Sequence, residues 1–483
     1  MPSTKRNLIL IFLLTVLARI VFYQLTGFTT DDAFITFRYA ENIAQGYGFV
    51  YNIGEHVLGT STPLFTLILA SFAALGMTAV KASLFISAVF SGLTAMVLYR
   101  FAQLLRFRWA SWLPVIAYIL FPRSLTADIS GMETAFFTLL VTSAFYYQHK
   151  RLEIYAIGMA TLATLTRPEG LWLLGLLLVY NWYKRPDRWF SYVLVPAILL
   201  VPWVIFAEWY FGSVVPNSVT AKLALYSQFG RPTPWQALRF MMAWHSVFGW
   251  ILFVSAVIGG WWLNRKQNFC WPVVIWFVGT VLFYMFSRTM LFFWYIVPIY
   301  PMYLLFATAA APFLIERYGP LVTRLNIIKP ALYGLVILVL LAADYVPVTH
   351  YRKQEQILLD VHRQIGIYLN AEASENQLVA AEDIGYIGYY SRRRILDRDG
   401  LISPEVIPYN RAGKYLQVIT DFQPSWVVAS ATSPISGFVN DSLFLAKYAR
   451  DTSFAAYDVR YLLFSRKVAD SSTAEQSLDK PGL

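Results

Sequence analysis

The chain has 483 residues, of which 57% are hydrophobic, 17% aromatic and only 14% charged. Soluble globular proteins carry about 25% charged residues, so this composition excludes a soluble enzyme and a disordered chain. The single cysteine, Cys270, excludes an intrachain disulfide and therefore a secreted disulfide scaffold. A protein that crosses a membrane several times remains.

The net charge of +11 does not indicate a nucleic-acid partner, because the excess base is confined to the apolar part of the chain. Residues 350–483 contain 15 Lys or Arg and 16 Asp or Glu, whereas residues 1–349 contain 24 and 12. Basic residues in an apolar chain mark cytoplasmic loops. No RNA or DNA motif is present, and no nucleic-acid partner is expected.

Apolar runs predict about eleven transmembrane helices, because a full span needs roughly 20 residues. The run 63–78 is marginal. If it does not cross, the inner loops hold 15 Lys or Arg and the outer loops before residue 350 hold 8; if it crosses, this bias is lost. We therefore interpret 63–78 as a re-entrant or membrane-surface helix, with the N-terminus cytoplasmic. The predicted spans are near 8–24, 82–99, 109–125, 131–147, 153–165, 168–183, 189–210, 240–263, 269–286, 290–314 and 329–348.

From about residue 350 the chain alternates short apolar runs with helix-like segments, which is typical of a small α/β domain. Its strands are expected at 377–381, 395–396, 426–429 and 461–464. The predicted fold class is mainly α: a polytopic helical bundle with surface helices in the first outer loop and a C-terminal α/β domain on the outer face. The predicted parts are a transmembrane domain (1–349), the extracytoplasmic α/β domain (350–469) and a disordered tail (470–483).

This topology places charged side chains of both signs at the outer ends of several spans. Ionisable groups at such positions are costly near lipid and often mark function. Carboxylates beside cations could bind an anionic substrate and also accept a proton. The candidates are Asp31 and Asp32 after the first span, and Glu133, Arg167, Glu169, Asn217, Lys222 and Arg288 in later outer loops.

Residues 31–44 have the pattern of a helix at the membrane surface. Asp31 and Arg38 are seven residues apart and share one face of it, which suits a base next to an anion clamp. A structural interpretation is equally open: Asp31 or Thr30 could cap the helix, and Arg38 could pair with Glu41.

Other candidates also have structural alternatives. Ser130 to Glu133 has the spacing of a capping box, which is the favoured role of Glu133. Arg167 is either a phosphate ligand or an interfacial residue that extends toward the lipid headgroups. The five histidines are scattered, so no metal site is predicted, although Asp31 and Asp32 together could hold Mg²⁺ or Mn²⁺.

The string DDAFITFRYAENIAQGYGFVYNIGEHVLGTSTPL (31–64) resembles the GT-C superfamily of membrane glycosyltransferases, which take sugar from a polyprenyl-phosphate carrier on the outer face. Within this superfamily it is most similar to the bacterial cell-envelope arabinofuranosyltransferases. The likeness extends over most of the chain through shorter matches at 131–134, 165–170, Asn217 with Lys222, and 383–391 with Asp397 and Gly400.

The resemblance implies an enzyme of the bacterial plasma membrane that moves a sugar, arabinofuranose or a related one, onto an envelope glycan or glycolipid. It implies that Asp31 or Asp32 is the general base. A departing phosphate needs no proton, so one carboxylate to deprotonate the acceptor is enough, and inversion is expected; hydrolases need both an acid and a base. Arg38, with Arg167, Lys222 and Arg288, would offset the phosphate charge.

Two other functions fit the composition. Buried charge also marks transport pathways, so the alternative is a transporter or flippase for an anionic lipid-linked sugar. Transporters often contain internal repeats, and none is visible here, which favours an enzyme. A membrane scaffold with an outer binding domain is the third interpretation, and it would be indifferent to the loss of either aspartate.

Overall fold

The structure is a computed structural model that describes residues 2–226, 232–242, 246–267, 271–287, 291–322, 348–467 and isolated positions between 334 and 346. Arg288, the expected tail at 470–483 and most of the predicted span 329–348 lie outside these residues. The described chain before residue 323 is helical, as its composition predicts. Its α-helices are α1 (Pro2–Thr26), α2 (Asp31–Ala44), α3 (Pro63–Ala74), α4 (Ala79–Leu104), α5 (Leu113–Leu120), α6 (Pro122–Ile129), α7 (Thr134–His149), α8 (Glu153–Thr166), α9 (Gly170–Lys184), α10 (Trp189–Phe211), α11 (Asn217–Tyr226), α12 (Pro234–Met241), α13 (Val247–Gln267), α14 (Trp271–Phe286), α15 (Phe293–Ile296) and α16 (Tyr300–Val322).

Several of these helices have the length and hydropathy of membrane spans. By these two criteria five described helices qualify: Thr4–Thr26, Ala79–Leu104, Pro186–Phe211, Val247–Lys266 and Phe293–Leu314. Each coincides with a predicted span, and the total of eleven stays a prediction. The expectation of a mainly α, multi-span fold is confirmed.

Two short segments decide how the chain turns. Helix α3 has 12 residues, or about 18 Å, which is far less than the roughly 30 Å of a bilayer core. This length agrees with a re-entrant or surface helix. The predicted span 109–125 is not one continuous helix, because α5 ends at Leu120 and α6 begins at Pro122. Proline has no N–H to continue the helix, and it leaves Phe121 extended, with ψ at 119°.

The C-terminal part is a small α/β domain around a five-stranded sheet in the order β2-β1-β3-β5-β4. Strands β1, β2 and β3 are parallel, whereas β5 runs antiparallel to both β3 and β4. Four strands fall where the sequence predicts them, and β4, an exposed edge strand, was not predicted. The elements are α18 (Val348–Ile357), α19 (Arg363–Glu372), β1 (Leu378–Ala381), α20 (Ile384–Ser391), β2 (Arg394–Asp397), α21 (Ile407–Ala412), α22 (Tyr415–Phe422), β3 (Trp426–Ser430), α23 (Ser442–Lys447), β4 (Tyr448–Ala456) and β5 (Val459–Arg466).

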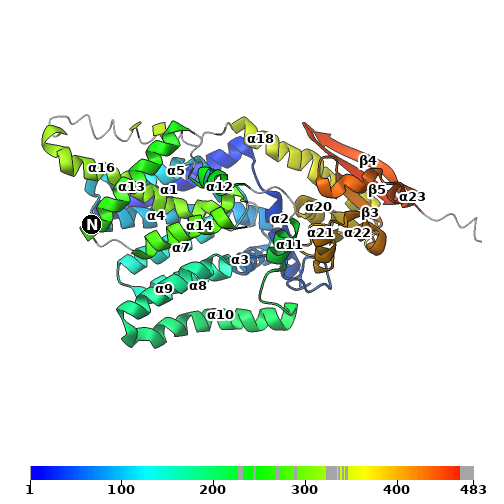
Figure 1. Cartoon of the computed structure of the whole chain (residues 1–483), viewed down its shortest axis with the longest axis horizontal. Coiled ribbons are helices and arrows are strands. Elements are labelled where there is room, and N and C mark those ends of the chain that lie inside the picture. Colours follow the sequence, from blue (N-terminus) through cyan, green and yellow to red (C-terminus); the bar gives the residue numbers. More distant parts are fainter. Residues whose placement is uncertain are drawn as a thin grey trace, which may run out of the picture.

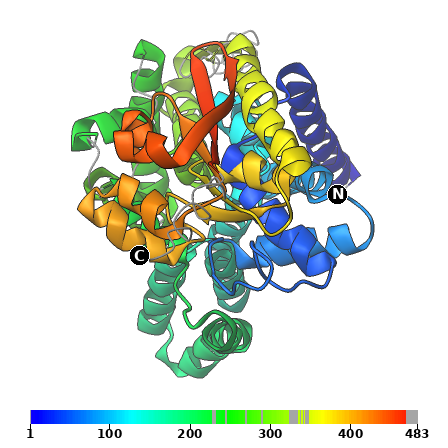
Figure 2. The same cartoon turned by 90° about the vertical axis from the view of Figure 1, so that its right-hand side faces the viewer.

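The sheet domain lies at one end of the helical bundle. Figure 1 shows α7, α8, α9 and α10 side by side with their axes roughly along the length of the molecule, with the sheet beyond α2 and α11, and with the start of the chain at the far end. Figure 2 views the molecule from the sheet end, where the first loop and the sheet domain cover the ends of the helices. The contact is apolar: Tyr39 and Tyr51 of the first loop belong to one buried cluster with Ile384 and Ile387 of α20.

Two glycines allow α20 to approach α2 closely. A Cβ atom on Gly385 would lie 1.9 Å from the backbone oxygen of Asp31, and one on Gly388 would overlap the hydroxyl of Tyr51. Real Cβ atoms do not come this near to other heavy atoms. The two glycines, three residues apart, therefore form the face of α20 that packs on the first outer loop, and this packing fixes the sheet domain above the helix ends.

Candidate functional site

A cavity of about 210 Å³ lies where the bundle meets the sheet domain. We call it the Asp32 cavity. Helices α2, α3, α7, α9 and α11 all begin beside it, and each N-terminus carries roughly half a positive charge. Residues of these helix starts face residues of α14, α15 and the sheet domain: Asp32, Ile35, Thr36, Gly59, Thr60, Ser61, Thr62, Met132, Glu133, Arg167, Pro168, Glu169, Ser218, Val219, Lys222, Phe283, Tyr284, Trp294, Tyr295 and Leu401.

Asp32 and Lys222 meet inside the cavity although 190 residues separate them. The Lys222 Nζ lies 3.4 Å from Asp32 Oδ2 and 3.4 Å from the Tyr295 hydroxyl. The Asp32 side chain is 33% exposed, so its carboxylate can reach a bound molecule. An ion pair at this distance and exposure is weak. Either group can therefore exchange its partner for a substrate at little cost.

Arg167 lies deeper in the wall, held by two carboxylates. Its guanidinium donates to Glu169 Oε1 at 2.9 Å and to the Trp294 carbonyl at 3.0 Å, and its Nε is 3.6 Å from Glu133 Oε1. The side chain is 3% exposed, which excludes the headgroup-directed conformation. The capping box expected at Ser130–Glu133 does not form, because the Glu133 side chain faces Arg167 and makes no cap hydrogen bond.

The local fold explains how Arg167 and Glu169 come to share one turn. The chain passes from α8 to α9 within a few residues, and Gly170 opens α9 against α8. A Cβ at this position would lie 2.4 Å from backbone atoms of Ala163 and Thr164. Only a glycine permits this approach, so it keeps the Arg167 side chain at the cavity wall.

Aromatic side chains form much of the remaining wall, and sequence reasoning missed them. The Tyr284 hydroxyl donates to Glu169 at 2.9 Å, and its ring stacks on Tyr295 at 5.9 Å. The Arg167 guanidinium lies 5.0 Å from the Tyr295 ring. These tyrosines are embedded in apolar, aromatic-rich segments, where nothing in the pattern separates a cavity wall from ordinary packing.

Asp31 points away from the cavity, toward the sheet domain. Its two carboxylate oxygens accept the backbone N–H groups of Gly385 and Tyr386 at 2.9 Å each, at the free N-terminus of α20. His362 Nδ1 is 3.4 Å from the same carboxylate. Asp31 therefore caps α20 rather than its own helix, whose N-cap residue, Thr30, makes no side-chain cap bond. This geometry separates the two aspartates that the sequence left equivalent.

Charged groups around Asp31 have shifted pKa values. Burial alone would lower the pKa of His362, but its hydrogen bond with Asp31 and the nearby Asp383 outweigh burial, so the pKa is raised. Burial raises the pKa of Asp383 to about 6. His362 therefore contacts Asp31 of the first outer loop, and the spacing of the histidines along the chain could not reveal this contact.

Arg38 contacts the sheet domain in the structure. Its guanidinium donates to the carbonyls of Gly388 and Arg393 at 2.8 Å each and lies 4.1 Å from the Tyr51 ring. It is 9% exposed and does not line the Asp32 cavity. The shared face of Asp31 and Arg38 is real, but it binds the two ends of α20: the carboxylate at the N-terminus and the guanidinium at the C-terminal carbonyls.

Two further candidates have outcomes of their own. Asn217 does not line the cavity; its amide donates to the carbonyls of Gly400 and Leu401, at 2.7 and 2.9 Å, and so ties the start of α11 to the sheet domain. Arg288 lies outside the described residues. Asp31 and Asp32, which together could hold a divalent ion, have separate partners: Asp31 binds the start of α20 and Asp32 pairs with Lys222. No group of three metal-binding side chains occurs in the part of the chain that the structure describes.

The electrostatics of the cavity combine both signs. Asp32, Glu133 and Glu169 supply carboxylates, and Arg167 and Lys222 supply cations. The formal excess of one negative charge is offset in part by the positive ends of the helix dipoles, because five helices begin beside the cavity. Such a site can hold an anion beside a carboxylate that remains free to accept a proton.

Comparison with solved structures identifies the fold. The chain aligns over 96% of its length with 98% of ArnT from Cupriavidus metallidurans bound to undecaprenyl phosphate, with a TM-score of 0.63 and 14% identity. The same protein in the apo state gives a TM-score of 0.60 at 14% identity, over the same shares of both chains. The archaeal oligosaccharyltransferase AglB from Archaeoglobus fulgidus, in complex with an inhibitory peptide and a dolichol-phosphate, gives 0.57 at 12% identity, covering 88% of this chain and 69% of AglB.

Sequence comparisons add one match. Residues 347–472 match a family described as a domain of unknown function, DUF8728, which coincides with the sheet domain. No curated protein matches the sequence. The structural likeness establishes that the chain has the GT-C fold of multi-pass membrane proteins, as residues 31–64 suggested.

Proposed function

We propose that this chain is an inverting membrane glycosyltransferase that uses a polyprenyl-phosphate-linked sugar. The observation that carries the proposal is the Asp32 cavity, in which a partly exposed carboxylate lies 3.4 Å from the Lys222 ammonium, with Arg167 in the same wall. The cations can bind the donor phosphate, and the carboxylate can accept the proton of the acceptor hydroxyl. The GT-C neighbours support the donor class, because one was solved with undecaprenyl phosphate and another with a dolichol-phosphate.

In the proposed reaction Asp32 is the base and Asp31 is a positioning residue. Lys222 exchanges Asp32 for the donor phosphate, which leaves the carboxylate free. The acceptor oxygen attacks the anomeric carbon from the face opposite the phosphate, while Asp32 takes the hydroxyl proton. The bond between the anomeric carbon and the phosphate oxygen breaks, and its electron pair leaves with the polyprenyl phosphate. Lys222 and Arg167 stabilise the negative charge that grows there.

The proposed sugar and location rest on features of the sequence. The similarity of residues 31–64 to arabinofuranosyltransferases favours arabinofuranose as the donor sugar and an envelope glycan or glycolipid as the acceptor. The same similarity favours a bacterial plasma membrane, and the distribution of Lys and Arg favours an N-terminus in the cytoplasm with the sheet domain outside. The Asp32 cavity then opens at the outer face, where a lipid-borne sugar is within reach.

The decisive experiment incubates purified protein with a panel of polyprenyl-phosphate sugars and an envelope glycan acceptor. Release of polyprenyl phosphate together with an inverted glycosidic product is the expected result. Retained anomeric configuration would contradict direct displacement. Movement of an intact lipid-linked sugar between the leaflets of a vesicle, with no bond broken, would instead identify a flippase.

A further inference from the structure

A second and larger cavity, of about 1210 Å³, lies at the other end of the bundle. Helices α7 and α9 begin at the Asp32 cavity and end at this one, and the 16 residues of α7 separate the two by about 24 Å. We call it the basic cavity. Its wall comes from the ends of α4, α7, α9 and α13 and from residues near α14 and α16: Leu104, Leu105, Arg106, Phe107, Arg108, Trp109, Gln148, His149, Arg151, Glu153, Tyr180, Asn181, Lys184, Arg185, Trp262, Lys266, Pro272 and Pro312.

The charge of this cavity is strongly one-sided. Six Lys or Arg side chains line it against one carboxylate, that of Glu153. The Glu153 carboxylate already lies 4.0 Å from Arg188, which is outside the lining. Among the described residues, none of Arg106, Arg108, Arg151 and Arg185 has a carboxylate within ion-pair distance. Within the described part of the chain, these four arginines therefore have no carboxylate partner of their own.

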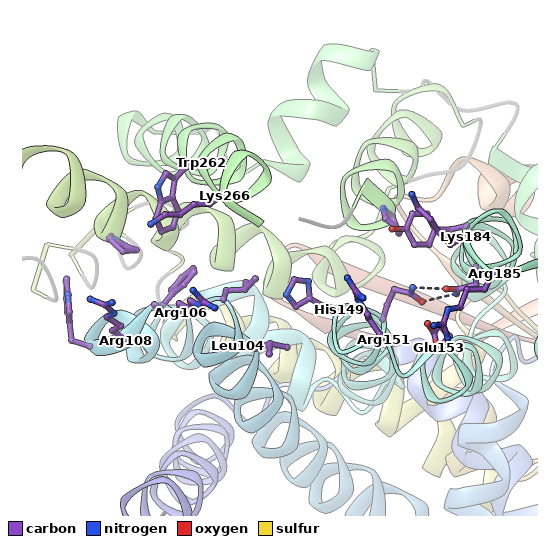
Figure 3. A pocket seen from close by; sticks show the side chains of 18 residues that line it. Leu104, Arg106, Arg108, His149, Arg151, Glu153, Lys184, Arg185, Trp262 and Lys266 are labelled. Atoms are coloured by element: carbon purple, nitrogen blue, oxygen red, sulfur yellow. Dashed lines mark hydrogen bonds between the residues drawn. The ribbon is translucent and has the colours of Figure 1, made fainter. Parts of the chain in front are cut away.

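The wall is built so that a buried polar floor lies beneath an exposed cationic rim. Gln148 and Asn181 are buried and exchange two side-chain hydrogen bonds, of 2.8 and 2.9 Å, drawn as dashed lines in Figure 3. The labelled basic residues in Figure 3 are distributed from Arg108 through Arg151 to Lys184 and Arg185, with Lys266 on a facing helix. A ligand in this space meets cations from four separate helix ends.

Backbone conformation adds a second observation. Arg106, Arg108 and Arg151 have φ values of 61°, 53° and 58°, in the left-handed region that residues other than glycine rarely adopt. Each such residue costs about 1 kcal/mol relative to glycine. Basic residues that only set the orientation of the protein in the membrane could occupy any nearby position of the loop. Here three strained positions carry arginine, and all three line the cavity.

Aromatic residues indicate the depth of this end in a bilayer. Trp182, Tyr183, Trp189 and Phe190 are exposed around the turn from α9 to α10, next to Lys184 and Arg185. Exposed Trp and Tyr side chains are enriched at the level of the lipid headgroups. The basic cavity therefore opens at the depth where the phosphates of phospholipids lie, and basic pockets between transmembrane helices are known to bind such headgroups.

We propose that the basic cavity binds the phosphate headgroup of an anionic phospholipid in the leaflet opposite the Asp32 cavity. Guanidinium groups bind phosphate oxygens through paired hydrogen bonds, and Arg106 and Arg151 present them from two different helix junctions. The volume exceeds what inorganic phosphate needs and suits a headgroup with its glycerol. Because the exposed aromatic surface of α10 adjoins the rim, the acyl chains would lie along that helix.

The test uses the full-length protein in a neutral detergent. Phosphatidylglycerol, neutral phosphatidylcholine and inorganic phosphate are titrated separately, with the melting temperature and native mass spectrometry as readouts. The variant is Arg106→Gln with Arg151→Gln. The matched control is Lys150→Gln with Arg265→Gln, which removes the same charge from exposed residues at this end that do not line the cavity.

The wild type and the control should bind phosphatidylglycerol alike. The cavity variant should bind it about 30-fold more weakly, at about fivefold for each of the two cations removed. Equal weakening in both variants, or equal binding of phosphatidylcholine, would overturn the proposal. Inorganic phosphate with an affinity matching phosphatidylglycerol would keep the phosphate site but overturn the lipid assignment.

A second measurement does not depend on any variant. A phosphatidylglycerol with a photoreactive group near its phosphate should label the wild-type protein in the segments 104–109 and 148–153. Labelling confined to the Asp32 cavity or to the outer surface of α10 would refute the site. Neither experiment involves sugar transfer, so its outcome is separate from that of the proposed enzyme activity.

Discussion

Replacing Asp32 by asparagine should abolish most of the transfer rate while leaving the fold intact. Loss of a general base lowers rates by about 10²–10⁴, equivalent to about 3–5 kcal/mol in the barrier. The stability cost is small, because Asp32 is one-third exposed and its pair with Lys222 at 3.4 Å contributes less than about 1 kcal/mol. The assay follows release of polyprenyl phosphate, with the melting temperature measured on the same sample.

Asp31→Asn provides the contrast, because it should act on the docking of α20. An asparagine keeps one acceptor oxygen and presents an NH₂ group to the other backbone N–H, so one charge-assisted hydrogen bond of about 1.5–3 kcal/mol is lost. Asp187→Asn, at an exposed residue at the far end of the bundle, is the control. Full turnover in Asp32→Asn, or an inactive Asp31→Asn with unchanged stability, would refute the division of roles.

Three further changes test other parts of the site. Lys222→Met should lower kcat by about 10²–10³, because the ammonium offsets the charge of the departing phosphate, and Lys222→Arg should restore part of the rate. Equal single-turnover rates for the wild type and Lys222→Met would exclude this role. Because the pKa of Asp383 is raised to about 6, its stabilising contribution is complete below about pH 4 and is lost as the pH rises through 6. Asp383→Asn should therefore make the melting temperature depend less on pH between pH 4 and 7. An unchanged slope of melting temperature against pH would contradict this. Gly385→Ala should destabilise the contact of α20 with α2 by more than about 1 kcal/mol, measured by melting temperature and limited proteolysis. Gly437→Ala is the control and should be neutral, because a Cβ atom there meets no atom within 4 Å.

Much of the architecture could be read from local patterns. Apolar runs and the positions of Lys and Arg predicted a membrane bundle, and alternating short runs predicted four of the five strands. The helix over 31–44 was predicted with its observed bounds. The break at Pro122 could have been predicted too, since proline leaves a helix without a donor at that point. These features depend on neighbours along the chain, which is why sequence reasoning reaches them.

The candidate site was predicted as a group of residues but not as an arrangement. Glu133, Arg167, Glu169, Asp32 and Lys222 do line one cavity. The roles of Asp31 and Arg38 could not be derived in advance, because both depend on α20, more than 340 residues away in sequence.

Hydrophobicity and charge along the chain were enough to place this protein in a membrane and to select a set of ionisable residues at one end of its helices. Only the packing of α20 on α2 decided which aspartate faces the cavity and which holds the sheet domain. Adjacent residues on a helix point about 100° apart, so the direction of each carboxylate is set by what packs against that helix. That partner is supplied by a distant part of the chain.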